Sequence, residues 1–246
     1  MEDRNYISEF LKCYDEHDFG NNPEKMYTFL RGYAIGGKLT QLCDALAFAR
    51  KKHSDQCRQE EYRNNKPEHG KMPYIVHPLR VACYLIGLEC FDRMSAFDKD
   101  TLLAAIVLHD LCEDCRVEFG QLPVEPETQK IVRLLTKTSV PGESKEDGRK
   151  RYFKGISSDV FAIISKAADR IDNLSTITHV TASGGAIDYN RIAKNLYETL
   201  AYIIPMLSEA KSEYPRYLST LTHIKDELER DVKMLRPFFP NCEASK

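Results

Sequence analysis

Four side chains that can bind a metal ion or move a proton fall within the segment His109-Asp110-Leu111-Cys112-Glu113-Asp114. His109 and Glu113 are four residues apart, and so are Asp110 and Asp114, which predicts that each pair shares one face of a helix. An apolar run directly precedes the segment, and a charge buried without a partner is energetically very unfavourable. We therefore interpret the segment as a chemical site, with an acidic and solvated helix end as the alternative.

Two further segments supply side chains of the same kinds. Asp169 and Asn173 are four residues apart in a helix-patterned run, and His77 precedes another predicted helix in the segment PYIVHP. Taken alone, Asp169 would more often form a surface ion pair with an arginine, and His77 would more often be a cap or a packed side chain. The spacing by itself does not show that these segments meet in space.

Taken together, the segments offer a ligand set of two histidines and two aspartates: His77, His109, Asp110 and Asp169. Mixed nitrogen and oxygen ligands suit an open-site divalent ion such as Mn²⁺ better than a closed structural zinc. Glu113, Asp114 and Asn173 would then lie near the ion without being needed as ligands. Such an ion lowers the pKa of a bound water, whose proton a nearby carboxylate accepts, and this chemistry fits hydrolysis.

Helical periodicity dominates the elements that would position these residues. Helices are expected over residues 6–14, 39–50, 78–88, 98–115, 127–136, 159–178, 190–210 and 217–235. Polar stretches with glycine and proline predict loops over residues 54–72 and 139–150. Alternating strand patterns are scarce, so the expected class is all-α, a helical bundle with the metal site between central helices. We expect one domain over residues 1–246, with its core at about 39–201.

Composition narrows the classes of protein further. The chain has 246 residues, of which 42% are hydrophobic and 29% are charged, as is ordinary for a globular protein. Its formal charge is −2, from 35 Lys and Arg against 37 Asp and Glu, so a nucleic-acid partner is not expected. The sequence holds no apolar run of the roughly 18 residues that a membrane span needs, and its first residues do not resemble a secretory signal. We expect a cytoplasmic protein, and the composition leaves open whether it forms a homo-oligomer.

The eight cysteines show no regular framework of spacings. In a long chain without a secretory signal, most should be reduced thiols that pack as small hydrophobic groups. The suggestive pair is Cys112-Glu113-Asp114-Cys115. A structural zinc site would need a second such pair, and a redox motif would normally open a helix after a strand. We therefore expect structural thiols, with redox sensing as the main alternative.

A histidine, a distant His-Asp doublet and a further aspartate resemble the pattern of the HD superfamily of metal-dependent phosphohydrolases. The similarity is greatest to the hydrolase domain of RelA/SpoT-type alarmone enzymes and to the small alarmone hydrolases. It rests on six segments in order: AFARKKHSDQCR (47–58), PYIVHPLRVA (73–82), LLAAIVLHDLCED (102–114), IVRLLTKTS (131–139), AADRIDNL (167–174) and RIAKNLYETLA (191–201). The doublet alone is a weak signal, whereas these motifs in this order are specific.

The resemblance implies an HD-type helical fold and hydrolysis of the 3′-pyrophosphate of (p)ppGpp-type alarmones, which yields GDP or GTP and pyrophosphate. Carried over residue by residue, it implies that Mn²⁺ is held by His77, His109, Asp110 and Asp169. Glu113 and Asp114 would activate or orient the water. The implied substrate contacts are Arg58 and Asn173 and, more weakly, Lys137, Arg191 and Lys194. The separate synthetase domain of the long family members has no room here, so synthetase activity is not expected.

Several departures from the family pattern leave the base and the phosphate contacts open. Arg58 is followed by Gln59 where the family has a second basic residue, and an insertion delays Pro73. Asp172 and Cys115 stand where the family usually has histidine and threonine. The alternative is therefore a related phosphohydrolase that acts on an adenine alarmone (ppApp) or another nucleotide. A nucleotide-binding regulatory module without turnover ranks last, since its expected signature is a missing ligand or a missing carboxylate pair.

Overall fold

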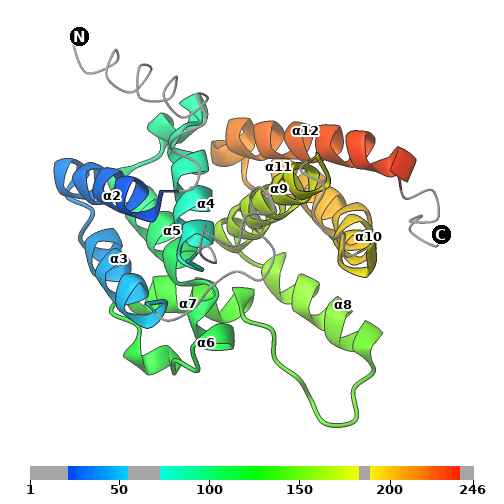
Figure 1. Cartoon of the computed structure of the whole chain (residues 1–246), viewed down its shortest axis with the longest axis horizontal. Helices are drawn as coiled ribbons and strands as arrows, with labels where there is room; N and C mark the ends of the chain where they lie inside the picture. Colours follow the sequence, from blue (N-terminus) through cyan, green and yellow to red (C-terminus); the bar gives the residue numbers. More distant parts are fainter. Residues whose placement is uncertain (1–21, 55–72, 183–188, 239–246) are drawn as a thin grey trace. The chain divides into compact units, whose positions relative to one another are not determined.

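The computed structural model describes residues 22–54, 73–182 and 189–238, together with their side chains except those of 176–182, 189 and 238. These residues form helices and connecting turns, and none of them forms a strand (Figure 1). The prediction of an all-α chain is therefore confirmed. The helix expected over residues 6–14 lies outside the described residues, as does nearly all of the loop expected over 54–72.

Contacts between residues divide the chain into two compact units. Unit 1 consists of residues 1–58 and 72–129, and unit 2 consists of residues 59–71 and 130–246. Helix α7 (Pro126–Leu135) includes residues of both. The prediction of a single domain over residues 1–246 stays a prediction.

The centre of unit 1 is a helix that is buried on nearly all sides. The described elements are α2 (Pro23–Gly37), α3 (Thr40–Lys52), α4 (Val76–Ile86), the 3₁₀ turn η1 (Glu89–Arg93), α5 (Ala96–Leu108), the short α6 (Leu111–Asp114) and the 3₁₀ turn η2 (Phe119–Gln121). α5 packs against α3 and α4, and α2 packs against the same two helices. Every residue of α5 from Asp100 to Leu108 is buried, as its unbroken apolar run predicts.

A buried carboxylate on α5 caps the start of α3. Leu39 precedes α3 and offers no side-chain cap to its first amides. Asp100 replaces that cap: its Oδ1 accepts from the amide of Leu42 at 2.8 Å, and its Oδ2 accepts from the amide of Gln41 at 3.1 Å. Burial raises the pKa of Asp100, and the amides of α3 partly offset this effect. One side chain thus joins two helices of the core by charge-assisted hydrogen bonds.

Unit 2 is organised around its longest described helix. Besides the end of α7, its described elements are α8 (Lys145–Ile156), α9 (Val160–Ala182), α10 (Tyr189–Glu198), the π-helical turn η3 (Thr199–Ile203), α11 (Ile204–Glu213), the 3₁₀ turn η4 (Pro215–Tyr217), α12 (Leu218–Leu235) and the 3₁₀ turn η5 (Arg236–Phe238). α9 packs against α8, α10, α11 and α12.

A buried ion pair connects α9 to the end of α10. Nη2 of Arg170 lies 2.7 Å from Oε2 of Glu198, and both side chains are almost fully buried. Burial alone would raise the pKa of Glu198, but Arg170, Lys137 and Lys166 lower it below its usual range. The carboxylate therefore remains ionised inside unit 2, where its charge is compensated.

The single helix predicted over residues 190–210 contains a widened turn. The amide of Ile204 donates to the carbonyl of Thr199, a step of five residues instead of four. Pro205 follows at once, and a proline inside a helix lacks an amide donor and crowds the carbonyl of the preceding turn. A π-helical turn accommodates such a ring without ending the helical run.

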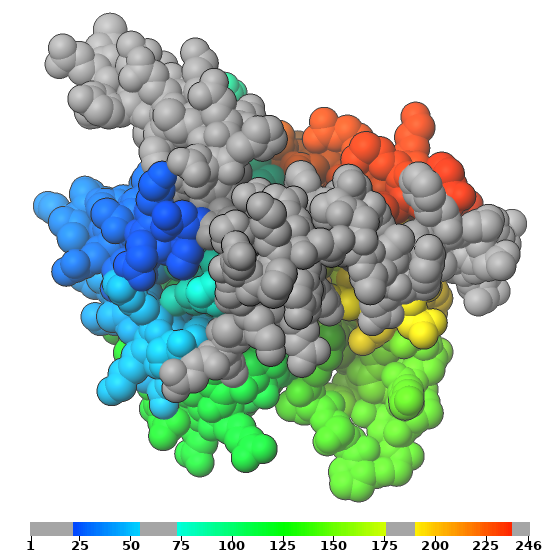
Figure 2. All heavy atoms as spheres, in the orientation of Figure 1, coloured from blue at the N-terminus to red at the C-terminus, as the bar shows by residue number. Residues whose placement is uncertain are grey.

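The sequence did not predict two of the described helices, α2 and α8. α2 begins with Asn22, whose side chain accepts from the amides of Glu24 and Lys25 at 3.1 and 3.0 Å. The loop predicted over 139–150 is wrong from Lys145 onwards, because Ser144 caps α8 by accepting from the amide of Asp147 at 3.1 Å. α8 is largely polar and contains two glycines, so its sequence lacks the apolar periodicity of a helix, and its atoms reach the surface (Figure 2).

The helices expected over residues 39–50, 78–88, 127–136, 159–178 and 217–235 are confirmed within a few residues at their ends. None of the helices in the described ranges is both long enough and apolar enough to cross a membrane.

Replacement of Asp100 by alanine should destabilise unit 1, because two amides at the start of α3 would lose a buried acceptor. The free energy of unfolding should fall by about 1–3 kcal/mol, measured by urea denaturation. Asp92→Ala is the control, since Asp92 is exposed and its change should stay within about 0.5 kcal/mol. Equal effects of the two substitutions would contradict the capping role.

Candidate metal centre

His77 is held in the interior of unit 1 by the first turn of α4. Its amide donates to the carbonyl of Tyr74 at 3.1 Å, in the turn that leads into the helix. Pro78 follows, and proline is tolerated there because amides of the first turn have no acceptor within the helix. Residues 75–79 are all buried, and only 2% of His77 is exposed. A buried imidazole in this position needs polar partners.

The helix predicted over residues 98–115 is interrupted at His109 and Asp110, between the end of α5 and the start of α6. Nδ1 of His109 lies 2.6 Å from the carbonyl oxygen of Ile106. In a continuous helix that carbonyl would accept from the amide of Asp110. Here it accepts from the amide of His109 at 3.4 Å as well as from the imidazole, so a tighter turn and a side chain together replace the helical hydrogen bond. The expectation that His109 and Glu113 share a face of one helix is therefore wrong.

The contact with Ile106 also assigns the two nitrogens of His109. A carbonyl oxygen only accepts, so Nδ1 carries the hydrogen in this contact. In the neutral ring, Nε2 then presents its lone pair. Metal-binding histidines commonly donate their other ring N–H to a backbone carbonyl in this way, which fixes the tautomer and the orientation of the ring.

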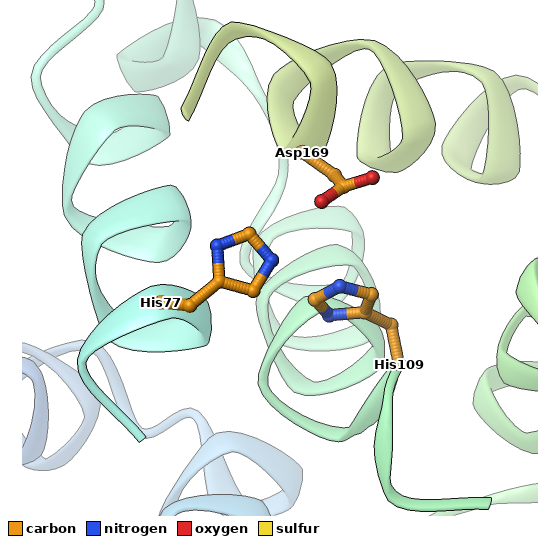
Figure 3. A group of neighbouring side chains, drawn as sticks. All are labelled: His77, His109 and Asp169. Carbon is orange, nitrogen blue, oxygen red and sulfur yellow. The ribbon is translucent and has the colours of Figure 1, made fainter. Parts of the chain in front are cut away.

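Asp110 brings the polar groups of unit 1 together. Its Oδ2 accepts from the hydroxyl of Tyr74 at 2.7 Å and lies 3.1 Å from Nε2 of His109 and 3.7 Å from Nε2 of His77. The two imidazole rings are 5.3 Å apart between centroids and meet edge to face at 64° (Figure 3). Within unit 1, the PYIVHP segment and the His-Asp doublet thus lie close together, which the spacing alone did not show; their role as metal ligands stays a prediction.

This cluster is suited to a cation. A neutral imidazole nitrogen and a carboxylate oxygen both present lone pairs, so an approach of 3.1 Å between them needs positive charge. The charge can be a proton on the ring or a metal ion that both atoms bind. The donor set therefore fits a divalent metal ion.

Tyr74 supports the cluster as a neutral hydrogen-bond donor. Burial raises the pKa of its phenol, and the neighbouring carboxylates of Asp110 and Asp114 raise it further. The hydroxyl consequently keeps its proton and directs it to Oδ2 of Asp110.

Asp169 occupies a comparably buried position in unit 2, on α9, with 5% of its surface exposed. Its Oδ2 lies 2.6 Å from Nζ of Lys166, and its Oδ1 accepts from the side-chain amide of Asn173 at 2.7 Å. The predicted shared face of Asp169 and Asn173 is thus confirmed. Burial alone would lower the pKa of Lys166, but Asp169 raises it above its usual range, so the pair remains ionised.

The group of described residues whose types could hold a metal ion consists of His77, His109 and Asp169. Figure 3 draws these three side chains: the first two belong to unit 1, and the third belongs to unit 2.

The other residues expected at the site are distributed over both units. Glu113 and Asp114 are exposed on α6 of unit 1. In unit 2, Nη2 of Arg191 lies 3.5 Å from Oδ1 of Asn173. Lys137 and Lys194 are exposed in the same unit, and Arg58 lies outside the described residues.

Sequence reasoning missed three side chains that shape these surroundings. Tyr74 was noted only as part of a motif, and Lys166 was not singled out, although it precedes Asp169 by three residues on one helix. That spacing is a usable signal for an ion pair. His53 is buried next to Tyr74, with ring centroids 5.0 Å apart. No local spacing predicts that contact, because it joins the end of α3 to the start of α4.

Comparison with known proteins found similar sequences but no matching family model. The guanosine-3′,5′-bis(diphosphate) 3′-pyrophosphohydrolase of Aquifex aeolicus is 28% identical over 138 residues, covering 54% of this chain and 17% of its own. The protein of that name from Borreliella burgdorferi is 27% identical over 183 residues, covering 71% and 25%. The GTP pyrophosphokinase rsh of Brucella melitensis biotype 1 is 35% identical over 127 residues, covering 48% and 16%.

These relatives confirm the resemblance to RelA/SpoT-type enzymes that the motifs predicted. The chain spans between 16% and 25% of the length of the three relatives. Their names describe two activities, removal of a 3′-pyrophosphate and pyrophosphoryl transfer to GTP.

Replacement of His109 by alanine should weaken binding of a divalent ion by more than the 10–100-fold that loss of an outer-shell contact typically causes. The reason is that Nε2 is the lone-pair nitrogen turned toward Asp110. Equilibrium dialysis against Mn²⁺, with metal analysis, measures the change. His223→Ala removes a histidine of α12 that is about half exposed and should bind like the wild type. Full metal occupancy in His109→Ala would contradict the ligand role.

Proposed function

We propose that this chain hydrolyses the 3′-pyrophosphate of a guanosine 3′,5′-bis(diphosphate)-type alarmone and releases pyrophosphate with GDP or GTP. The observation that carries the proposal is the cluster around Asp110, in which the Nε2 atoms of two buried imidazoles lie 3.7 and 3.1 Å from a carboxylate oxygen, a donor set that fits a divalent ion. The names of the Aquifex and Borreliella relatives support the class of substrate.

The proposed ligands of one divalent ion are His77, His109, Asp110 and Asp169. Three of them are already gathered within unit 1 by the start of α4 and the end of α5. The fourth is a buried, ionised carboxylate of unit 2. Two nitrogen and two oxygen ligands favour Mn²⁺ over a structural zinc, which prefers a closed set rich in thiolates or imidazoles.

The proposed reaction is attack of water on the phosphorus next to the ribose. A divalent ion in this ligand set supplies Lewis-acid charge and lowers the pKa of water towards neutrality. Glu113 and Asp114 lie three and four residues after the proposed ligand Asp110 and are exposed, so their carboxylates can accept the proton of the attacking water. The new bond joins the water oxygen to phosphorus, the bond from phosphorus to the 3′ oxygen breaks, and the 3′ oxygen takes up a proton.

The proposed phosphate contacts come from the basic residues of unit 2 and from Arg58. Arg191 lies beside Asn173, and Lys137 and Lys194 are exposed. A pyrophosphate carries several negative charges, which arginine binds through its planar fork and lysine binds as a point charge. The buried Lys166 is committed to Asp169 and is not proposed as a substrate contact.

One feature favours a second substrate for the same chemistry. Asp172, which stands where the family usually has histidine, is buried on α9 between Asp169 and Asn173 in the chain. A carboxyl group and an imidazole differ in the hydrogen bonds that they accept and donate, and an enzyme distinguishes nucleobases by such hydrogen bonds. An adenine alarmone or another nucleotide is therefore the alternative substrate.

A product assay tests the function. Purified protein with Mn²⁺ is offered ppGpp, pppGpp and ppApp, and released pyrophosphate is distinguished from orthophosphate. Metal-dependent release of pyrophosphate from the guanine compounds is the expected result, and faster release from ppApp would establish the alternative. Orthophosphate as the main product would contradict the proposed bond cleavage. As a control, the protein is incubated with GTP and ATP, and formation of a pyrophosphorylated guanosine nucleotide would reveal pyrophosphoryl transfer.

The double substitution of Glu113→Gln with Asp114→Asn should remove the proton acceptors and leave the metal ligands in place. Turnover should fall by about 10²–10⁴-fold, the usual contribution of general acid–base catalysis, while the bound Mn²⁺ stays unchanged. Glu89→Gln changes an exposed carboxylate of η1 in the same unit and should retain activity. Unchanged turnover in the double variant would rule out the assigned role.

A further inference from the structure

The described cysteines fall into two groups. Cys83 and Cys90 are buried, and burial strongly raises the pKa of the Cys83 thiol, which makes it unreactive. Cys43, Cys112 and Cys115 are partly exposed. Cys112 and Cys115 flank Glu113 and Asp114 in the sequence. A bond between the two cysteines would therefore change the conformation of the turn that carries both carboxylates.

The local backbone brings Cys112 and Cys115 within reach of each other. Cys112 lies in α6, and Cys115 ends it, with its amide donating to the carbonyl of Leu111 at 3.0 Å. Residues three apart on a helical turn have Cβ atoms about 5–6 Å apart, whereas a disulfide requires roughly 3.5–4.5 Å. Closing the bond therefore needs a modest movement of the turn. Cys115 has already left helical geometry, at φ −107° and ψ 4°.

Cys115 also lies next to a group that can accept its proton. Its Sγ is 3.6 Å from Nδ1 of His53 and 3.5 Å from the carbonyl oxygen of Lys52. His53 is 1% exposed, so its ring is held in place. A thiol beside an imidazole is the usual arrangement of a reactive cysteine, because the thiolate is the nucleophile.

The imidazole of His53 lies between Cys115 and the proposed metal centre. The ring of His53 packs on Tyr74 at 5.0 Å between centroids, and the hydroxyl of Tyr74 donates to Asp110 at 2.7 Å. A change at Cys115 can therefore reach Asp110 along the chain through Glu113 and Asp114 and across space through His53 and Tyr74. All of these residues belong to unit 1.

We propose that Cys112 and Cys115 form a reversible disulfide when the protein meets a peroxide, and that the disulfide lowers hydrolysis by moving the turn of Glu113 and Asp114. The sequence alone favoured structural thiols, and the exposure of the pair and the contact with His53 reverse that preference. The predicted inhibition of hydrolysis rests on the proposed hydrolase function, whereas the predicted disulfide does not depend on it.

The steps balance with hydrogen peroxide as the oxidant. His53 takes the proton of Cys115, and the thiolate attacks one peroxide oxygen, so that an S–O bond forms and the O–O bond breaks. The products are a sulfenic acid and, after protonation, water. Cys112 then attacks the sulfenic sulfur, the S–S bond forms, the S–O bond breaks, and the second water leaves. Two thiols are oxidised by two electrons, and one peroxide is reduced.

Peptide mapping tests the disulfide directly. Trypsin cuts after lysine and arginine, so it releases residues 100–116 with Cys112 and Cys115 as their only cysteines, and residues 39–50 with Cys43 alone. The full chain is treated with hydrogen peroxide, alkylated and digested. Peptide 100–116 should resist alkylation, be lighter by two hydrogen masses and take up two alkyl groups after reduction. With alkylation carried out in denaturant, peptide 39–50 should be alkylated equally with and without peroxide, because burial raises the pKa of the Cys43 thiol in the folded chain and leaves little thiolate to react with peroxide.

Two variants separate the roles of the pair. Cys112→Ser should stop at the sulfenic acid of Cys115, which a 1,3-dione captures, and His53→Gln should slow that oxidation on the order of tenfold. Unhindered alkylation of both cysteines after peroxide would overturn the proposal. A disulfide from either cysteine to another part of the chain, or zinc released on oxidation, would overturn it as well.

The effect on hydrolysis is measured on the same samples. Peroxide should lower pyrophosphate release by about 10–100-fold, the scale of a misplaced catalytic group, and a thiol reductant should restore it. Cys115→Ser should have the same activity before and after peroxide. A disulfide without loss of activity would overturn the predicted inhibition of hydrolysis. A protein that forms the disulfide but hydrolyses no alarmone in either state would refute the proposed function and leave the disulfide site standing.

Discussion

The arrangement of unit 1 depends on one carboxylate oxygen. Oδ2 of Asp110 is approached by a phenol hydroxyl and by the nitrogens of two buried imidazoles. The lone-pair nitrogen Nε2 of His109 lies beside this carboxylate oxygen, an arrangement that positive charge stabilises, since an uncompensated buried charge is strongly destabilising. Tyr74 supplies one hydrogen, but a neutral phenol does not neutralise a carboxylate. The cluster is therefore the feature from which a cation, and with it the chemistry, is inferred.

The interruption between α5 and α6 follows from the same requirement. In a continuous helix from residue 96 to 114, the carbonyl of Ile106 would accept from the amide of Asp110. In the structure it accepts from the amide and the ring of His109 instead, and Asp110 lies beside His77. α6 then places Glu113 and Asp114 at the surface. His109 and Asp110 thus form the short break itself, and the exposed Glu113 and Asp114 follow it on α6.

The elements of the fold that depend on local pattern could be predicted, and those that depend on distant contacts could not. α5 was expected from its apolar run, and the Asp169–Asn173 pair was expected from a spacing of four on α9. The break at His109 was missed because it results from a side chain that competes with a helical hydrogen bond, which residue types do not reveal. α8 was missed because a polar helix with two glycines lacks apolar periodicity. The contacts of Asp100 with α3 and of His53 with Tyr74 join segments far apart in the sequence, which no local pattern encodes.

The partly buried Asp110 of unit 1 and the buried Asp169 of unit 2 are held by different means, and the difference bears on how a metal ion would be bound. In unit 2, the ammonium of Lys166 keeps Asp169 ionised, and Asn173 engages its second oxygen. That carboxylate is compensated before any ion arrives, so an ion would have to share it with a lysine. In unit 1, Oδ2 of Asp110 accepts from a neutral phenol and lies 3.1 and 3.7 Å from the nitrogens of two imidazoles. A cation would therefore have to share Asp169 with the ammonium of Lys166, whereas beside His77, His109 and Asp110 it would approach two imidazole nitrogens and a carboxylate oxygen, the atom types that bind divalent metal ions.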